Sequence, residues 1–286
     1  MKKVFLAIFV LLTSFTILGC ANISPMPVNS DNLQAILDRG YIVVGLECNY
    51  APFNWSVERS AASELAVQQV GSRAFCDGYD VQIAQTIADA LGVELRVLAV
   101  DWDGLIPSLA INGQIDMIIA GMSPTAERAQ TVAFSNEYYH STHVVVLRSD
   151  SLYANATSIA DFTGAKVVGQ MNTFYDELVD QLIGANHLNP LGDVPTIVTG
   201  IKSGTYDATI LELPVAVAIT AANPELTYIE FASGNGFNVA YEDSAVAIAV
   251  RQSDVSLLAQ INAILATISE TTRETWMLNA INRQPE

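Results

Sequence analysis

The chain has 286 residues, of which 51% are hydrophobic and 15% are charged, and its 30 Asp and Glu residues outnumber 13 Lys and Arg residues. This apolar fraction excludes an intrinsically disordered chain, and the length suffices for one or two domains with a core of their own. The net charge of −17 argues against nucleic acid as a partner and against a polybasic membrane patch, because both rely on dense Lys and Arg.

The N-terminus has the pattern of an export signal. Lys2 and Lys3 precede an apolar run that ends in a glycine directly before Cys20. This junction resembles the lipobox of bacterial lipoproteins, although a bulky leucine stands two residues before the cysteine. We predict a signal peptide over 1–19 and a lipidated tether over 20–30; ordinary secretion is the alternative. No later apolar run approaches the ~20 residues that span a bilayer, so the lipid would be the only membrane contact.

Two cysteines remain once Cys20 is assigned to the lipid. Outside the cytoplasm, a leftover pair of cysteines is more often bridged than free. We therefore predict a disulfide between Cys48 and Cys76; two separate buried thiols are the alternative.

The first half of the exported chain alternates helices and strands. Apolar residues over 80–91 recur on one helical face and stop at Gly92. The stretch 54–78 breaks the alternation, and we interpret it as an inserted loop or hairpin with a short helix around 61–70. The other elements predicted here, in chain order, are a helix over 31–39, a strand over 41–46, a strand over 93–100, a helix over 105–111 and a strand over 115–120.

A second set of alternating elements follows. It is predicted to contain strands over 144–147 and 166–169, a helix over 173–183, a strand over 208–211, a helix from 214 to 222, strands over 228–231 and 246–250, and a helical tail over 255–281. Strands that alternate with helices predict an α/β fold with mostly parallel sheets.

Four stretches in order carry a family resemblance. They are Tyr50-Ala51-Pro52-Phe53, Gly78-Tyr79-Asp80, Trp102-Asp103-Gly104-Leu105, and the segment from Ile115 through Gly121 and Arg128 to Ser135. At these spacings the chain resembles the polar-amino-acid class of solute-binding proteins of ABC importers, extracellular solute-binding protein family 3. The similarity spans nearly the whole exported chain.

The resemblance implies the two-lobed periplasmic-binding-protein fold of type II, with two α/β lobes and the ligand in the cleft between them. Lobe one would comprise 29–137 plus 248–286, and lobe two would comprise 143–242. Two crossover segments, 138–142 and 243–247, would act as the hinge. Hinge motion would close the lobes around the ligand.

The resemblance also implies an amino-acid clamp. Arg128 would take the ligand carboxylate, because a guanidinium matches a carboxylate with two parallel hydrogen bonds. Ala120, Gly121 and Ser123 follow a buried strand, at the edge where open α/β sheets place ligands. Glu212 would receive the α-ammonium group. The alternatives are an exposed Arg128, an N-cap role for Ser123 and an exposed acid at a helix start for Glu212.

Gln170 and Thr173 would add contacts from lobe two, at the start of a helix whose free N–H groups suit a carboxylate. Helix capping alone is the alternative. The family usually has glycine directly before this threonine, where this chain has Asn172.

Tyr50 and Trp102 occupy positions where family members hold the ligand side chain between aromatic faces; core packing is the alternative. Glu47 would then be a surplus carboxylate in the cleft. Because a buried unpaired charge is costly, Glu47 predicts a ligand with a cationic or amide side chain.

The sequence thus predicts an extracytoplasmic lipoprotein, expected to be a monomer, that delivers a free amino acid to an ABC permease. No cofactor is expected, and His140, His143 and His187 form no metal-ligand pattern. Two other classes remain open: a dehydratase-like enzyme of the same fold acting on a cyclic acid, and a ligand-sensing domain of a receptor.

Overall fold

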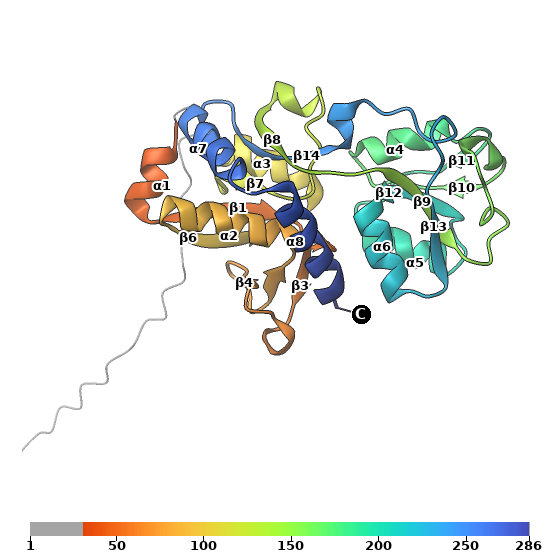
Figure 1. Ribbon diagram of the computed structural model, residues 1–286, viewed down its shortest axis with the longest axis horizontal. Coiled ribbons are helices and arrows are strands. Elements are labelled where there is room, and N and C mark those ends of the chain that lie inside the picture. The colour runs from red at the N-terminus through yellow and green to blue at the C-terminus, as the bar shows by residue number, and fades with distance from the viewer. Residues whose placement is uncertain (1–30, 286) are drawn as a thin grey trace, which may run out of the picture.

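A computed structural model describes residues 31–285, so the predicted signal peptide, Cys20 and the tether over 20–30 lie outside the described residues. The chain forms two five-stranded sheets and a small four-stranded sheet (Figure 1). Each large sheet has its own layer of helices. Within 31–285 no helix is long and apolar enough to cross a bilayer.

The first large sheet has the strand order β6-β1-β7-β14-β8. Its strands are β1 (Tyr41–Leu46), β6 (Glu94–Ala99), β7 (Met117–Ile118), β8 (Val132–His140) and β14 (Ala245–Arg251). β6, β1 and β7 are parallel neighbours, whereas β14 runs antiparallel to both β7 and β8. Every residue of β1 except Tyr41 is buried, as expected for a central strand with both faces covered.

Helices cover this sheet on both sides. They are α1 (Leu33–Arg39), α2 (Tyr79–Leu91), α3 (Leu105–Ala110), α7 (Val255–Leu265) and α8 (Glu270–Arg283). α2 buries the predicted apolar face and ends at Gly92, which adopts φ +70°. The predicted helical tail is two helices: Ser269 accepts a hydrogen bond from the Thr272 amide and starts α8 as a new helix.

The second large sheet has the order β11-β10-β12-β9-β13. Its strands are β9 (His143–Arg148), β10 (Lys166–Val167), β11 (Asn186–His187), β12 (Ala208–Glu212) and β13 (Leu226–Ile229), and its helices are α4 (Phe174–Leu178), α5 (Val194–Lys202) and α6 (Leu213–Ala222). β11, β10 and β12 are parallel and β9 is antiparallel to its neighbours, so both large sheets are mixed.

Single 3-10 turns complete the chain. They are η1 (Arg59–Ala61), η2 (Trp102–Gly104), η3 (Arg128–Gln130), η4 (Ile159–Asp161), η5 (Val179–Gln181) and η6 (Tyr241–Ser244).

The insertion and the two residues of β2 before it form the small sheet, with the order β2-β3-β5-β4. Its strands are β2 (Asn49–Tyr50), β3 (Asn54–Val57), β4 (Val67–Gln68) and β5 (Phe75–Asp77). The predicted short helix around 61–70 is wrong: only η1 and a loop precede β4, because this stretch has no apolar face to bury. A disulfide joins Cys48 to Cys76, whose Cα atoms are 5.6 Å apart.

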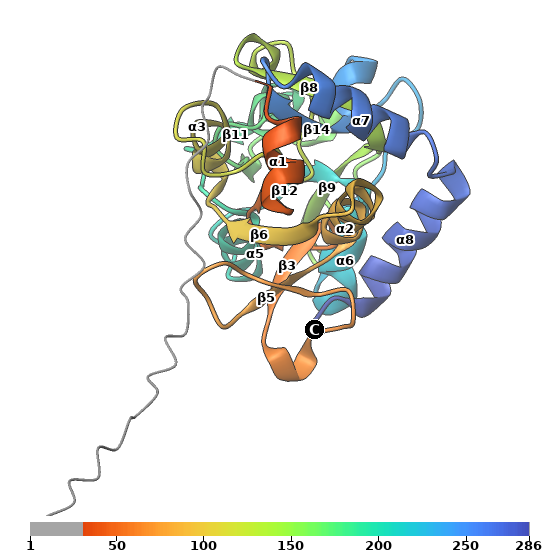
Figure 2. The same cartoon turned by 90° about the vertical axis from the view of Figure 1, so that its left-hand side faces the viewer.

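The chain crosses between the large sheets twice, from β8 to β9 through Ser141 and Thr142, and from η6 into β14. α8 then returns to lie beside α6 (Figures 1 and 2), where Gln284 donates a hydrogen bond to the Ala218 carbonyl at 2.8 Å. The lobe and hinge boundaries given above remain a prediction. Below, "lobe one" means the part built on the first large sheet and "lobe two" the part built on the second.

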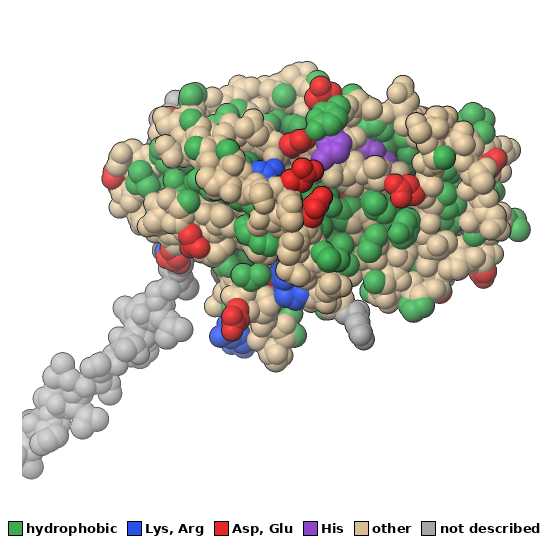
Figure 3. Space-filling view, in the orientation of Figure 1, with side chains coloured by type: hydrophobic (Ala, Val, Ile, Leu, Met, Phe, Trp, Pro, Cys, Tyr) green, Lys and Arg blue, Asp and Glu red, His purple; other side chains and the backbone are tan. Residues whose placement is uncertain are grey.

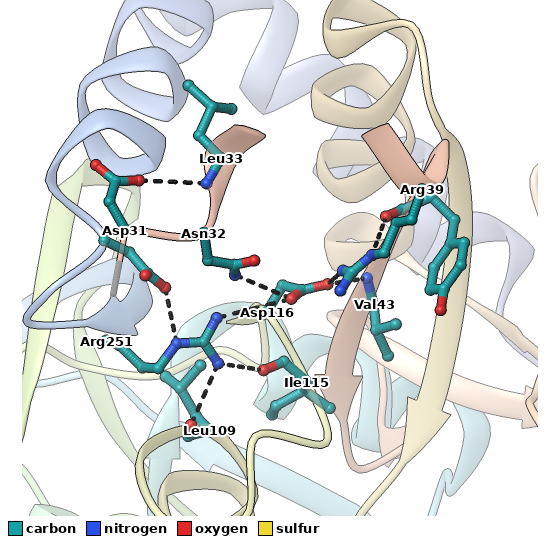
Figure 4. Close-up of polar contacts among 11 residues, drawn as sticks. Asp31, Asn32, Leu33, Arg39, Val43, Leu109, Ile115, Asp116 and Arg251 are labelled. Carbon is teal, nitrogen blue, oxygen red and sulfur yellow. Dashed lines mark hydrogen bonds and ion pairs between the residues drawn. The ribbon is translucent and has the colours of Figure 1, made fainter. Parts of the chain in front are cut away.

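A buried ionic network fixes β7 in lobe one (Figure 4). Asp116 forms ion pairs with Arg39 and with the fully buried Arg251, and it accepts hydrogen bonds from the Val43 amide at 2.7 Å and from Asn32 Nδ2 at 3.0 Å. Paired in this way, a buried carboxylate keeps its charge compensated. The network therefore fixes the start of the segment that leads into Gly121 and Ser123.

Candidate functional site

A cavity lies between the two lobes. Its lining residues follow the carboxyl ends of parallel strands, as expected for open α/β sheets. Lobe one contributes Glu47, Tyr50, Trp102, Gly121, Ser123 and Arg128, and lobe two contributes Gln170, Thr173, Phe174 and Tyr175. Eight of the ten ligand-site residues predicted from the sequence therefore meet in one cavity.

Ala120 and Glu212 are the two predicted residues that do not line this cavity. Ala120 is fully buried and supplies only the backbone that leads into Gly121. Glu212 ends β12 directly behind two lining tyrosines.

Arg128 presents its guanidinium to the cavity from η3. Its Nη1 donates to the Ser123 carbonyl at 2.9 Å, its Nη2 donates to the Asn172 carbonyl at 3.0 Å, and its Cζ lies 4.9 Å from the centroid of the Trp102 ring. Burial lowers the pKa of Arg128 to about 10, so the group stays protonated at neutral pH. A guanidinium has five N–H donors, and those not used here can bind a carboxylate.

Glu47 follows β1 and is half-buried. Burial, together with the nearby carboxylates of Asp193 and Asp101, raises the pKa of Glu47 to about 8. Gln170 Nε2 lies 3.5 Å from Glu47 Oε1, which is long for a hydrogen bond. The Glu47 carboxyl group therefore has only a weak hydrogen-bond partner in Gln170, and it can accept a hydrogen bond from a ligand.

Glu212 is 1% exposed, and burial raises its pKa to about 8. The Tyr175 hydroxyl donates to Glu212 Oε2 and the Tyr50 hydroxyl also hydrogen-bonds this carboxylate, while Oε1 has no partner of good geometry among the described residues. An unpaired buried carboxylate oxygen is rare and marks a place where a donor is missing.

Four aromatic side chains line the cavity: Tyr50, Trp102, Phe174 and Tyr175. Phe174 and Tyr175 were not predicted; their rings are 4.3 Å apart and His143 packs 5.1 Å from Phe174. The signal that could have found them is their place in the first turn after β10. Aromatic faces around one space suit an aliphatic stem or a cation.

The backbone conformation of Gly121 allows the Tyr50 ring to pack closely against the lobe-one wall of the cavity. Gly121 has φ +59°, and a Cβ there would lie 3.1 Å from the Tyr50 ring. Only glycine meets both conditions without strain.

Gln170 and Thr173 form the lobe-two wall. The Thr173 hydroxyl donates to the Gln170 carbonyl at 2.8 Å and makes no cap hydrogen bond to α4, so the capping alternative for Thr173 is not realised. Gln170 Nε2 also donates to the Gly192 carbonyl at 3.2 Å.

The three histidines do not line the cavity. His187 bridges Asp176 and Asp180 at 2.9 and 2.8 Å, and burial lowers the pKa of His143 to about 4. Across residues 31–285 no group of three or more His, Cys, Asp or Glu side chains has an arrangement that could hold a metal ion.

Comparison with known proteins gives consistent matches. The family described as bacterial extracellular solute-binding proteins, family 3, matches residues 42–277. A probable histidine-binding protein of Campylobacter jejuni is 30% identical over 85% of this chain and 87% of its own length. An arginine-binding extracellular protein of Bacillus subtilis, ArtP, is 27% identical over 79% of each chain.

Solved structures of binding proteins are also similar to this chain. The holo form of ArgBP from T. maritima is 33% identical, covers 85% of this chain and 98% of its own, and superposes with a TM-score of 0.66. The substrate-binding protein AbpA from Streptococcus pneumoniae, bound to L-arginine, is 25% identical, covers 87% of this chain and 98% of its own, and gives a TM-score of 0.72.

Proposed function

Because the chain belongs to the bacterial extracellular solute-binding proteins of family 3, we propose that it captures a cationic amino acid outside the cytoplasm and delivers it to the permease of an ABC importer. The family and the type II two-lobed fold predicted from the four sequence stretches are both confirmed. Members of this family are extracytoplasmic.

One observation carries the proposal: a single cavity between two lobes is lined by a guanidinium, a carboxyl group and four aromatic rings. Arg128 suits the α-carboxylate that every free amino acid carries. Glu47 lies among aromatic faces and lacks a strong partner, which suits a cationic side chain. Relatives named for arginine and histidine binding support this choice.

Glu212 completes the clamp. Its unpaired Oε1 would accept the ligand α-ammonium, directly or after a small shift of Tyr50 and Tyr175. The three charges of a basic amino acid would then each meet an opposite charge in a dry site, where such pairing is strongest.

The test is a thermal-shift screen of the twenty amino acids, followed by calorimetry on the best ligands. Arginine, lysine and histidine should give larger shifts than glutamate or aspartate. A dominant shift with an acidic or purely apolar amino acid would overturn the proposal. Ligand recovered chemically unchanged after incubation, measured by NMR, separates a binding protein from a dehydratase-like enzyme.

Arg128→Ala tests the carboxylate assignment. Removing one member of a buried charge pair costs on the order of 2–5 kcal/mol, so affinity for the best ligand should fall at least ~30-fold. Arg128→Lys should recover little, because an ammonium cannot form the fork. Arg96→Ala is the control, since Arg96 lies on β6 outside the cavity, where it pairs with Glu94 and stacks on the Tyr41 ring. Near-normal affinity for Arg128→Ala would contradict the assignment.

We also propose that a lipid on Cys20 holds the protein at the membrane, since two acyl chains give stable anchoring where one is marginal. Cys20→Ser should release the protein from the membrane fraction. An unmodified Cys20 in the intact mass of the membrane-bound protein would contradict this.

A further inference from the structure

Asn172 joins the two lobes through three hydrogen bonds. Its backbone carbonyl accepts from Trp102 Nε1 at 3.2 Å and from Arg128 Nη2 at 3.0 Å. Its side-chain Nδ2 donates to Asp103 Oδ1 at 2.7 Å. Asn172 follows β10 in lobe two, whereas its three partners belong to lobe one. A single residue thus connects lobe two to three residues of the opposite lobe.

The backbone of Asn172 is in an unusual conformation. Its φ is +58°, and it shares a positive φ with only one other non-glycine residue among the described residues, Cys48. Asparagine tolerates this region better than most side chains. Glycine would present the same carbonyl but would lack the amide that binds Asp103. The side chain therefore adds one contact between the lobes to those that the backbone makes.

We propose that Asn172 is a positioning residue that holds the lobes in the closed arrangement and orients Arg128 and Trp102 for the ligand. It does not line the cavity, so it acts through these two side chains. The inference rests on the proposed function, because it takes the cavity as the amino-acid site and the lobes as moving parts.

The three bonds need no ligand, since both partners of each bond belong to the protein. They therefore favour the closed arrangement before binding, and they must break before a bound ligand can leave. A residue that biases this equilibrium changes ligand affinity mainly through the dissociation rate.

Three variants distinguish the role of the Asn172 side-chain amide from the role of its backbone carbonyl. Asn172→Gly keeps the positive φ and the carbonyl but removes the donor. Asn172→Asp keeps the shape but sets a carboxylate against Asp103, so the lobes should repel. Combining Asn172→Asp with Asp103→Asn restores one donor and one acceptor with reversed polarity. Asn112→Asp adds the same charge at an exposed site after α3 and is the control.

The readouts are the lobe separation of the unliganded protein, measured by fluorescence energy transfer between labels on the two lobes, and the dissociation rate of arginine in stopped flow. Asn172→Gly should raise the dissociation rate about threefold, as expected for the loss of one exposed hydrogen bond, and Asn172→Asp about tenfold, because it adds charge repulsion to that loss. Both should widen the lobe separation. The reversed pair should return to within about twofold of wild type.

Wild-type lobe separation in Asn172→Asp, or failure of the reversed pair to restore closure, would overturn the inference. If no amino acid in the panel binds the wild-type protein, the proposed function fails. The lobe separations of the unliganded variants would still decide the role of Asn172, so the two failures are distinguishable.

Discussion

At the scale of single residues, the cavity depends on a backbone conformation that suits glycine and on carboxyl groups that are incompletely satisfied. Gly121 adopts a positive φ beside an aromatic ring, Glu212 Oε1 lacks a well-placed partner, and Glu47 has only a distant partner. Incompletely satisfied carboxyl groups cost stability in the empty protein and are expected where a ligand supplies what is missing.

Gly121→Ala should affect both folding and binding. Forcing a Cβ into left-handed backbone should cost about 1–2 kcal/mol of unfolding free energy, and the Cβ would also push the Tyr50 ring. Gly40→Ala is the matched control, because Gly40 has φ +75° but open space around it. Both variants should lower the urea midpoint, and only Gly121→Ala should weaken ligand binding. Unchanged ligand affinity in Gly121→Ala would contradict the assignment of Tyr50 to the binding site.

Ligand affinity should depend on pH through Glu47 and Glu212. Burial raises both pKa values to about 8, so at pH 7 both carboxyl groups are largely protonated in the empty protein. A cationic ligand favours the ionised forms, so binding lowers these pKa values and releases protons. Affinity should therefore rise with pH from about 6 to 8 and level off above. Calorimetry in buffers of different ionisation enthalpy measures the released protons, and Glu47→Gln should reduce their number.

At the scale of elements, the insertion is connected to both the cavity and the C-terminal helix. Cys48 lies between Glu47 and Tyr50, and its disulfide partner Cys76 precedes Asp77, which forms an ion pair with Arg283 of α8 at 3.0 Å. The small sheet thus supports the cavity wall that follows β1.

Removing the disulfide should destabilise the protein and loosen this wall. For a sequence separation of 28, loop-closure entropy predicts about 3.5 kcal/mol of lost unfolding free energy. The double variant Cys48→Ser with Cys76→Ser should show this loss in urea unfolding, and its ligand affinity should fall as well. Wild-type affinity in a destabilised double variant would mean that the insertion stabilises the fold without supporting the site.

The elements that the sequence predicted well are those whose pattern is local. β1 and α2 were placed to within a residue because β-branched residues and a 3.6-residue apolar period decide them. β8 was missed because it is half-exposed and pairs irregularly with β14. α5 was missed as well; its short sequence carries a proline in the first turn and several polar residues.

The residues of the candidate site also divide into those that the sequence predicted and those that it did not. Eight residues were found because the family resemblance assigns a ligand-binding role to their positions in the sequence. Phe174 and Tyr175 were missed although they directly follow the predicted Thr173 at the start of α4, because only the approach of lobe two to lobe one makes them cavity residues. The position of Glu212 behind the tyrosines is likewise a result of packing between β12 and α4.

At the scale of the whole molecule, charge is the dominant feature. The net charge is −17, and acidic side chains with two histidine patches gather near the middle of one face (Figure 3). The groove beside Arg128 is lined by four acids, Glu127, Asp176, Glu177 and Asp243. This field attracts cations to the cleft and repels acids.

Salt should therefore slow the association of a cationic ligand. The Debye length is ~10 Å at 0.1 M salt. Ionic strengths above ~0.1 M therefore screen the attraction between a cationic ligand and the acids around the cleft. In stopped flow, the association rate of arginine should fall several-fold between low and high salt, whereas that of a ligand with a neutral side chain should change little. Equal salt dependence for both ligands would show that the acidic field does not steer binding.

The N-terminal end of the described chain has a mechanical consequence. Asp31 accepts a hydrogen bond from the Ser256 amide at 2.7 Å, and Asn32 is held by Asp116 in the buried ionic network. A force applied through the chain before Asp31 therefore enters the molecule in lobe one, through α7 and β7, and bypasses both crossovers. A protein tethered at this end would keep lobe one as its fixed frame, so the opening and closing of lobe two would not load the tether.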